Sequence, residues 1–511
     1  MTRTDNRKWW ALGALTLSVL AVGLDGTILS VALPTLAGAL HATETDLQWF
    51  SSGYLLVLAA AMLPAGLLGD RFGRRLVMLA ALALFGAGSA ACAFAPSASA
   101  FIAARLVLGL AGAGIVVMAL SALTVMFDEA ERPRAVGVWA AANFLALPIG
   151  PILGGWLLTH YWWGWVFLIN VPVALVGLIA GLALVPESRA PVRPALDPVG
   201  VLASTAGLVG LAYGFVEAGQ RGWTDAAVVG PIAAGLVALA AFLLWERRLS
   251  RRPGGRPLVD PDLFRSGTFT WGVLLSAVMG LAMIGVIFTL PQYFQAVVGT
   301  DAMGSGLRLL PLIAGLVAGA LPADRIAARV GRRAVIAAGF ALLAAGMALG
   351  ATTAVTSGGG FVAVWTILVG AGTGLTMSTA AATALSALSP ERSGVGSAVM
   401  QAVQKVGGPF GVAIMGSVLS TVYLANLHTD GLPQVARDSV FGGLAVAQRL
   451  GSAPLAASVR SAFVQGMDAA MLVSAGIAVA GIVLSVLFLP GRRTATGAET
   501  PVEERPVVVR G

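Results

Sequence analysis

Long runs of apolar residues recur along almost the whole chain and are separated by short polar or Pro/Gly-rich segments. Each run has about 20 residues or more, enough for a helix to cross a hydrocarbon core about 30 Å thick. The pattern therefore predicts an all-α polytopic membrane protein. We expect fourteen spans, at residues 9–33, 48–68, 76–95, 100–127, 135–159, 165–185, 199–218, 227–245, 269–293, 304–323, 334–354, 361–388, 396–424 and 466–489.

The sequence repeats itself at an offset of 258 residues. Between residues 63–90 and 321–348, 14 of 28 aligned positions are identical. The same offset places span 1 on span 9 and span 5 on span 13, which predicts two six-helix halves with spans 7 and 8 inserted between them. Parallel repeats of this kind build transporters with the substrate site between the halves, near the middle of the bilayer.

This division defines the expected domains. They are a cytoplasmic N-terminus (1–8), an N-terminal half (9–185), a cytoplasmic loop (186–198), the inserted spans (199–245), a basic cytoplasmic linker (246–268), a C-terminal half (269–489) with a long outer loop (425–465), and a disordered cytoplasmic tail (490–511).

Composition agrees with the membrane class. Hydrophobic residues make up 57% of the 511 residues and charged residues only 11%, whereas soluble domains carry about 25% charged residues. These values exclude a soluble globular protein. Cys92 is the single cysteine, so an intrachain disulfide is impossible and a cysteine-based metal site is not expected.

The net charge of +8 is explained by membrane topology rather than by nucleic-acid binding. Loops on one predicted side hold 25 basic residues, loops on the opposite side hold 5, and two basic residues lie inside spans. The positive-inside rule then places both termini in the cytoplasm. Only two of the 32 basic residues are lysines, and this bias toward arginine indicates a GC-rich bacterial genome. Residues 9–34 follow Arg3, Arg7 and Lys8 but are too long for a signal peptide, so we expect a retained first helix.

Asp25 lies in the middle of span 1. A carboxylate at that depth is costly when it is ionised, so burial favours its uptake of a proton. One interpretation is proton coupling or cation recognition, and the other is a packing hydrogen bond to Thr27 or to a neighbouring helix. Its repeat partner is Met283, which confines any such role to the first half.

Two cations also lie within spans. Arg105, about one turn into span 4, either snorkels to the outer interface or provides a fixed charge that lowers the proton affinity of a nearby carboxylate. Lys405 in span 13 repels or replaces cationic cargo, or pairs with a carboxylate; the sequence does not choose.

The short loop between spans 2 and 3 combines glycines with charges. Glycines allow the two helices to turn sharply, and an Asp/Arg pair can hold a neighbouring helix end in one conformation. The simpler alternative is a positive-inside anchor. The predicted conformational latch consists of Gly66, Gly69, Asp70, Arg71, Gly73, Arg74 and Arg75.

Span 5 is rich in proline and glycine, which predicts a bent helix that packs closely against its partners. The motif residues are Gly150, Pro151, Gly154 and Gly155, and the motif recurs in span 13. Candidate residues for the cavity between the halves are Asn143, Gln401, Lys405 and Met283. We interpret Glu217 and Asp468 as solvated residues at outer span ends, and the loop 425–465 as a lid, an interfacial helix or a tolerated insertion.

With these motifs placed, residues 9 to 490 resemble the major facilitator superfamily, specifically its 14-span drug:proton antiporters, which include quaternary-ammonium and multidrug efflux pumps. The resemblance rests on Asp25 to Pro34, Gly66 to Arg75, Arg105 to Gly112 and Gly150 to Gly155, with Asn170-Val171-Pro172 also similar. The sequence departs from the pattern at Ala146 and Gly164, where glycine and arginine are usual.

The resemblance implies a role in proton coupling for Asp25 and in proton relay for Arg105. It implies the conformational latch for Asp70 and Arg71, and it implies that the span 5 motif holds the outward-closed helix packing of exporters. The expected function is proton-coupled export of amphipathic small molecules, such as antibiotics or natural products, by alternating access. Partners would be cargo, protons and the lipid bilayer, and we expect a monomer.

Two other functions are weighed. A proton-coupled uptake symporter on the same fold is the first alternative, and the span 5 motif argues against it. A membrane-embedded enzyme is the second, but His41, His160 and His428 all fall in predicted outer loops and no acid/base or metal cluster converges within the spans. We therefore expect no enzymatic activity, no cofactor and no metal site, and the absence of a phosphate-binding loop argues against a nucleotide-driven pump.

Overall fold

The computed structural model describes residues 3–128, 131–189, 197–252, 257–259, 261–388, 390–427 and 432–489, and these residues form helices and no strands. Thirteen helical segments among them are long and apolar enough to cross a membrane. The fifth predicted span coincides with a further helix, α5, of which the structure describes only some side chains. The all-α polytopic prediction is confirmed. The predicted C-terminal tail lies outside the described residues, as do parts of the two loops, predicted to be cytoplasmic, that flank the inserted spans.

The first half contains the six predicted spans, the last of which is broken after one helical turn. Thr43 and Asp46 form a capping box that starts the second helix, and Gly73 ends it with a φ of 123°, a conformation that favours glycine. The helices are α1 (Arg3–Ala39), α2 (Glu44–Phe72), α3 (Arg74–Ala93), α4 (Ala98–Met126), α5 (Arg132–His160), α6 (Trp165–Leu168) and α7 (Asn170–Leu184).

The second half repeats this plan with more interruptions. Pro64 lies inside α2, whereas its repeat partner Pro322 separates α12 from α13; Gly331, the partner of Gly73, again has a positive φ of 92°. The elements are η1 (Pro261–Arg265), α10 (Gly267–Gln292), η2 (Tyr293–Val297), α11 (Ala302–Arg308), α12 (Leu310–Ala320), α13 (Ala323–Val330), α14 (Arg332–Gly350), α15 (Gly359–Leu385), α16 (Pro390–Asn426), α17 (Gln434–Asp438), α18 (Val440–Arg449) and α19 (Ala453–Phe488).

The predicted outer loop 425–465 is shorter than expected from the hydropathy. Among its described residues it contains the short helices α17 and α18, and α19 begins at Ala453 rather than near residue 466. Ser452 caps α19 by accepting a hydrogen bond from the Leu455 amide, so the helix starts within a polar stretch that apolar periodicity does not detect.

Each half has its own apolar core. One core is built from α1 to α7 and the other from α10 to α19, with Phe288 and Val412 of the second half packed on the first core and Val31 of the first half packed on the second. The inserted helices α8 (Pro198–Arg221) and α9 (Ala226–Ser250) form a hairpin. Leu208 and Ala212 of α8 pack against Leu56 of α2 and Phe410 of α16, so the hairpin covers one seam between the halves.

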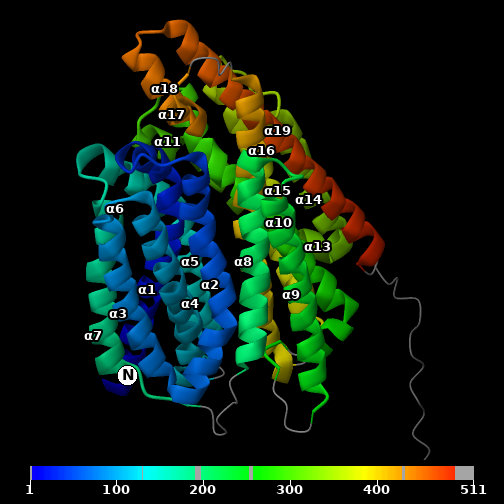
Figure 1. Cartoon of the computed structure of the whole chain (residues 1–511). Helices are drawn as coiled ribbons and strands as arrows, with labels where there is room; N and C mark the ends of the chain where they lie inside the picture. Colours follow the sequence, from blue (N-terminus) through cyan, green and yellow to red (C-terminus); the bar gives the residue numbers. More distant parts are fainter. Residues whose placement is uncertain are drawn as a thin grey trace, which may run out of the picture.

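The halves meet mainly at one end of the bundle. We call the end at which α1 begins the terminal end and the opposite end the distal end. At the distal end α11 and α18 of the second half contact the first half, and α19 then runs down and away from it (Figure 1). There the Gln295 side chain donates a hydrogen bond of 3.0 Å to the Val31 carbonyl across the seam.

Candidate functional site

A buried ion pair lies at the centre of the first half. Arg105 of α4 donates a hydrogen bond from Nη1 to Asp25 Oδ2 of α1, and the two residues are 1% and 2% exposed. Arg105 Nε also donates to the Phe50 carbonyl of α2 at 3.1 Å, and Asn170 Nδ2 of α7 donates to Asp25 Oδ1 at 3.2 Å. Four helices therefore converge on one carboxylate and one guanidinium.

Tyr54 completes this cluster. The Arg105 guanidinium lies 4.2 Å from the centroid of the Tyr54 ring, within the range of a cation–π interaction. The Tyr54 hydroxyl donates to the Val22 carbonyl of α1 at 3.0 Å, which fixes the ring between the two helices. Breaking a buried pair of this kind by removing one partner costs about 3–5 kcal/mol, because the remaining charge has no compensation.

These contacts exclude one alternative for Arg105 and one for Asp25 that the sequence left open. Snorkelling of Arg105 to the interface is wrong, because its side chain is buried and bound to Asp25. Asp25 does not bond Thr27; the Thr27 hydroxyl instead donates to the Ala146 carbonyl of α5 at 3.0 Å. Asp25 therefore contacts neighbouring helices, but through a full ion pair rather than a single packing hydrogen bond.

A cavity of about 380 Å³ lies between the halves, next to the ion pair. Tyr54 and Arg105 border it, and Gln401, Lys405 and Met283 line it, whereas Asp25 is not among the lining residues. The side chain of Asn143 lies outside the described residues. Of the described residues that line the cavity, none is an aspartate or glutamate.

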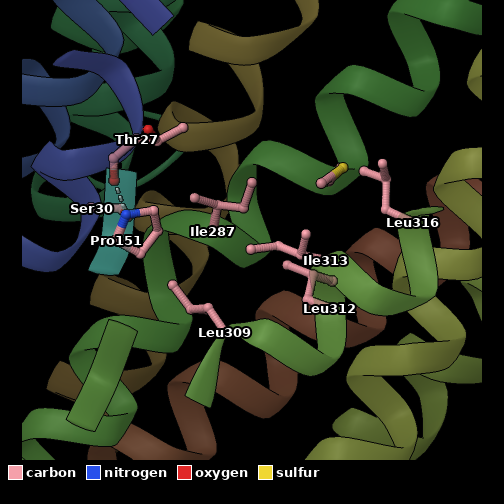
Figure 2. Close-up of a pocket in the computed structure, with 9 residues that line it drawn as sticks. Thr27, Ser30, Pro151, Ile287, Leu309, Leu312, Ile313 and Leu316 are labelled. Atoms are coloured by element: carbon pink, nitrogen blue, oxygen red, sulfur yellow. Dashed lines mark hydrogen bonds between the residues drawn. The ribbon is translucent and has the colours of Figure 1, made fainter. Parts of the chain in front are cut away.

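The opposite wall of the cavity is apolar. It comes mainly from α10, α12 and α15 and comprises Met279, Met283, Ile284, Ile287, Phe288, Leu316 and Met377. A smaller pocket of about 20 Å³ lies beside it. In Figure 2, Thr27, Ser30 and Pro151 of the first half face Ile287 and apolar side chains of α12. The cavity thus has the mixture of apolar surface and few polar groups that is typical of small-molecule sites.

The glycine motif of α5 packs against two different partners. A side chain at Gly150 would overlap Thr27, and a Cβ at Gly154 would lie 2.7 Å from Ile28 Cγ2, so both glycines face α1. A Cβ at Gly155 would lie 2.7 Å from the Ala302 carbonyl oxygen and from Met303 Cα. One face of α5 therefore seals against α1 within the first half, and the adjacent face seals against α11 of the second half.

The charged side chains at the loop between α2 and α3 bond to one another and to the end of α7. Arg74 donates to Asp70 Oδ1 from Nε at 3.1 Å and from Nη2 at 2.9 Å. Arg75 Nη2 donates to the Leu182 carbonyl at the end of α7 at 2.6 Å, and the Arg75 amide donates to Glu187 Oε1 at 3.3 Å. These contacts of Arg74 and Arg75 stay within the first half and the segment that directly follows it.

The glycines of the predicted latch allow neighbouring segments to approach closely. Gly69 packs tightly on Met118 of α4, and Gly66 lies near Val117 of the same helix. Gly73 is closed over by the Glu187 carboxylate. The Arg71 guanidinium lies 5.6 Å from the Phe72 ring centroid. Asp70 therefore pairs with Arg74 rather than with Arg71.

We expect Asp70→Asn to slow transport without weakening cargo binding. The change removes a half-exposed ion pair, worth at most about 1 kcal/mol of folding stability, but it frees Arg74 at the hinge between α2 and α3. A tenfold slower cycle corresponds to about 1.4 kcal/mol of barrier, and we expect a loss of about that size. Initial rates in proteoliposomes and equilibrium binding of the same dye measure the two quantities separately. Asp262→Asn, which breaks the exposed pair with Arg265, is the control; weakened binding with an unchanged rate would contradict the latch.

Glu217 and Asp468 differ from each other. Glu217 of α8 pairs with Arg221 at 2.8 Å near the distal end of the helix. Asp468 lies well inside α19 and is partly exposed, but its Oδ1 is buried without a hydrogen-bond partner among the described residues, so only part of this carboxylate is solvated. Tyr54 is the cluster member that sequence reasoning missed entirely; an aromatic residue in an apolar span carries no local signal.

Comparison with known proteins identifies the family. The model of the Major Facilitator Superfamily matches residues 15–412. The chain belongs to this superfamily. Major facilitator proteins of known function are also similar over almost the full length: a tetracenomycin C resistance and export protein of Streptomyces glaucescens is 32% identical over 98% of this chain and 94% of its own. The multidrug efflux pump LfrA of Mycolicibacterium smegmatis is 33% identical over 94% of this chain and 97% of its own.

A solved structure confirms the major facilitator fold independently. A bacterial homolog of the human lysosomal transporter Spinster, in an inward-facing and unoccupied conformation, superimposes with a TM-score of 0.66 at 16% sequence identity. The match covers 96% of this chain and 98% of the other. The protein is thus a multi-pass membrane transport protein, as the repeat and the four motifs predicted.

Proposed function

We propose that this protein is a proton-coupled exporter of amphipathic small molecules, such as antibiotics or natural products, in the cytoplasmic membrane of a bacterium. The single observation that carries the proposal is the buried Asp25–Arg105 pair beside an amphipathic cavity between the two halves. The export and efflux names of the two relatives over nearly the whole chain support the direction of transport.

The ion pair supplies a physical basis for coupling. While Asp25 is ionised, its attraction to Arg105 holds α1 against α4, and Asn170 and Phe50 complete the hydrogen bonding of the pair. A proton on Asp25 removes the negative charge, so the guanidinium keeps only contacts to neutral groups, among them the Phe50 carbonyl and the Tyr54 ring. Because α1 also contacts α5 and the second half, the protonation state of Asp25 biases the packing of the halves.

The contacts between the halves support a state closed at the distal end. The Gln295 to Val31 hydrogen bond and the approach of Gly155 to α11 both lie there. With the termini in the cytoplasm, this state would receive cargo from the cytoplasm, and opening of the distal seam would release it outside. In this arrangement α5 acts as the distal seal and Asp25 as the proton site that determines when the seal opens.

Proton movement in proteoliposomes tests the proposal. Vesicles that contain the purified protein and the pH dye pyranine are given a pH gradient, and anionic, neutral and cationic amphipathic dyes are added in turn. We expect at least one dye to dissipate the gradient faster than in protein-free vesicles and to accumulate against its own gradient, with a protonophore abolishing the accumulation. If dyes cross only downhill, at rates independent of the pH gradient, the proposed coupling is wrong.

A further inference from the structure

The charged side chains that line the cavity, among the described residues, are both cationic. Asp25 is buried behind Arg105 and does not line the cavity. Lys405 of α16 does line the cavity and is exposed to it. Arg105 at the border is balanced by its ion pair with Asp25, so Lys405 is the charge of the described lining that no carboxylate balances.

The ammonium group of Lys405 is available to a ligand. It forms no ion pair with any residue whose side chain the structure describes. Other charged residues do form ion pairs: four occur in the described part of α1–α8. Glu391 at the start of α16 is fourteen residues away along the helix, or about 21 Å at 1.5 Å per residue, which is beyond the reach of an ion pair. The alternative in which Lys405 pairs with a carboxylate of the protein therefore finds no partner here.

The surroundings of Lys405 suit one charged group on an apolar body. Gln401 and Gln404 lie beside it on α16 and offer amide donors. Across the cavity, the methionines and Phe288 of the apolar wall offer adaptable, polarisable contacts. An occupant that displaces water also lowers the local dielectric constant, which strengthens attraction to an anion and repulsion of a cation.

We propose that Lys405 is the recognition group for an acidic cargo, so that the transported molecules are amphipathic anions: a carboxylate, sulfonate or ionised phenol on an apolar ring system. The acid group lies against Lys405 and the glutamine amides, and the ring lies against the α10 wall. This inference rests on the proposed function and narrows its substrate class. It also assigns separate roles to the two charged residues that face or border the cavity: Lys405 selects cargo, and Arg105 holds Asp25.

Binding of a matched charge series tests the inference without a proton gradient. The probes are 9-anthracenecarboxylate, 9-anthracenemethanol and 9-anthracenemethylammonium, which share one ring system and differ in charge. Fluorescence anisotropy with the full-length protein in phosphatidylcholine nanodiscs, corrected with protein-free discs, gives each affinity. We expect the wild-type protein to bind the carboxylate about tenfold more tightly than the alcohol, equivalent to about 1.4 kcal/mol, and to bind the ammonium most weakly.

Variants at Lys405 assign the preference to this side chain. Lys405→Met is expected to bind the carboxylate and the alcohol equally, Lys405→Arg to keep the preference, and Lys405→Glu to reverse it in favour of the ammonium. Met377→Leu on the apolar wall across the cavity is the matched control; it offers no polar contact to the acid group, so it can change all three affinities but keeps their order. An unchanged order in Lys405→Met, or a preference of the wild-type protein for the ammonium, would overturn the inference.

Two further measurements separate the sources of a result. The first repeats the binding experiment in discs with one third phosphatidylglycerol. If the carboxylate probe still binds, the anion recognised is a soluble one. If the lipid displaces the probe from the wild-type protein but not from Lys405→Met, the anion recognised is a lipid headgroup; both outcomes support the Lys405 site. Proton flux driven by the neutral alcohol is then compared between the wild-type protein and Lys405→Met. Proton flux in both proteins, with no charge selection in the binding series, would contradict the inference and support the proposed function. Charge selection with no proton flux would support the inference and contradict the proposed function.

Discussion

Asp25→Asn is expected to abolish proton-driven transport while leaving exchange of cargo across the membrane intact. Asparagine keeps the shape and one hydrogen-bond acceptor for Arg105 but cannot carry the negative charge or exchange a proton in the physiological range. Cargo-dependent proton flux into pyranine-loaded proteoliposomes should fall to the level of protein-free vesicles. Equilibrium exchange of cargo, which needs no coupling, should remain measurable.

The same substitution carries a cost in stability that must be separated from its effect on coupling. Arg105 is 1% exposed, and without Asp25 its charge is buried and unpaired, so we expect a loss of about 3–5 kcal/mol. The double variant Asp25→Asn/Arg105→Gln removes both charges and should recover much of this stability, because replacing a buried pair by neutral groups is often close to neutral. It should nevertheless remain uncoupled.

Glu217→Gln is the control for Asp25→Asn, because it also removes one carboxylate. Glu217 forms an ion pair with Arg221 near the distal end of α8, and that arginine is half exposed, so its removal should change stability by at most about 1 kcal/mol and leave coupling intact. Normal gradient-driven transport in a folded Asp25→Asn/Arg105→Gln variant would show that the proton binds elsewhere.

The sequence predicted the parts of this site but not their assembly. Hydropathy locates Asp25 and Arg105 at membrane depth, and a charge at that depth needs a partner. Apolar periodicity does not fix which face of α1 meets which face of α4, so the pairing required coordinates. The span 6 resemblance included Asn170, yet its contact with Asp25 depends on the break between α6 and α7, which the even hydropathy of residues 165–185 conceals.

Interruptions of helices were the other feature that the sequence left undetermined. The repeat aligns Pro64 with Pro322, but only Pro322 lies at a break between two helices, where it is the N-cap of α13. After Pro64 the chain continues with Gly66 and Leu67, whereas Asp324 and Arg325 follow Pro322 and form a separate, strongly amphipathic turn of helix. The number and order of the spans follow from length and hydropathy alone, while such breaks depend on which side of each helix its neighbours cover.

Gly155→Leu is expected to open the distal end of the transporter. A Cβ at this position would lie 2.7 Å from Ala302 O and Met303 Cα of the other half, and backbone atoms cannot move aside as a flexible side chain can. Overpacking of a close contact costs about 1–3 kcal/mol. A cost of about 1.4–2.7 kcal/mol within this range shifts the ratio of open to closed states by about 10- to 100-fold. Gly155→Ala should cause a smaller shift in the same direction.

Cysteine labelling measures this shift. Cys92 is the single cysteine and is buried, so Cys92→Ala removes it and Ser30→Cys places a reporter in the cavity. A membrane-impermeant maleimide added at the distal side should label the reporter about 10- to 100-fold faster in Gly155→Leu than in the parent, following the population shift.

Two other glycines distinguish a seal from general disruption. Gly476→Leu in α19 is the control, because a Cβ there meets nothing within 4 Å. Gly150→Leu should instead lower thermal stability without faster labelling, since Gly150 faces Thr27 within its own half. If Gly155→Leu folds and labels no faster than Gly476→Leu, the contact between α5 and α11 does not control the distal seam. Equal acceleration by Gly150→Leu and Gly155→Leu would point to loosening of α5 as a whole, because only Gly155 of the two touches the other half.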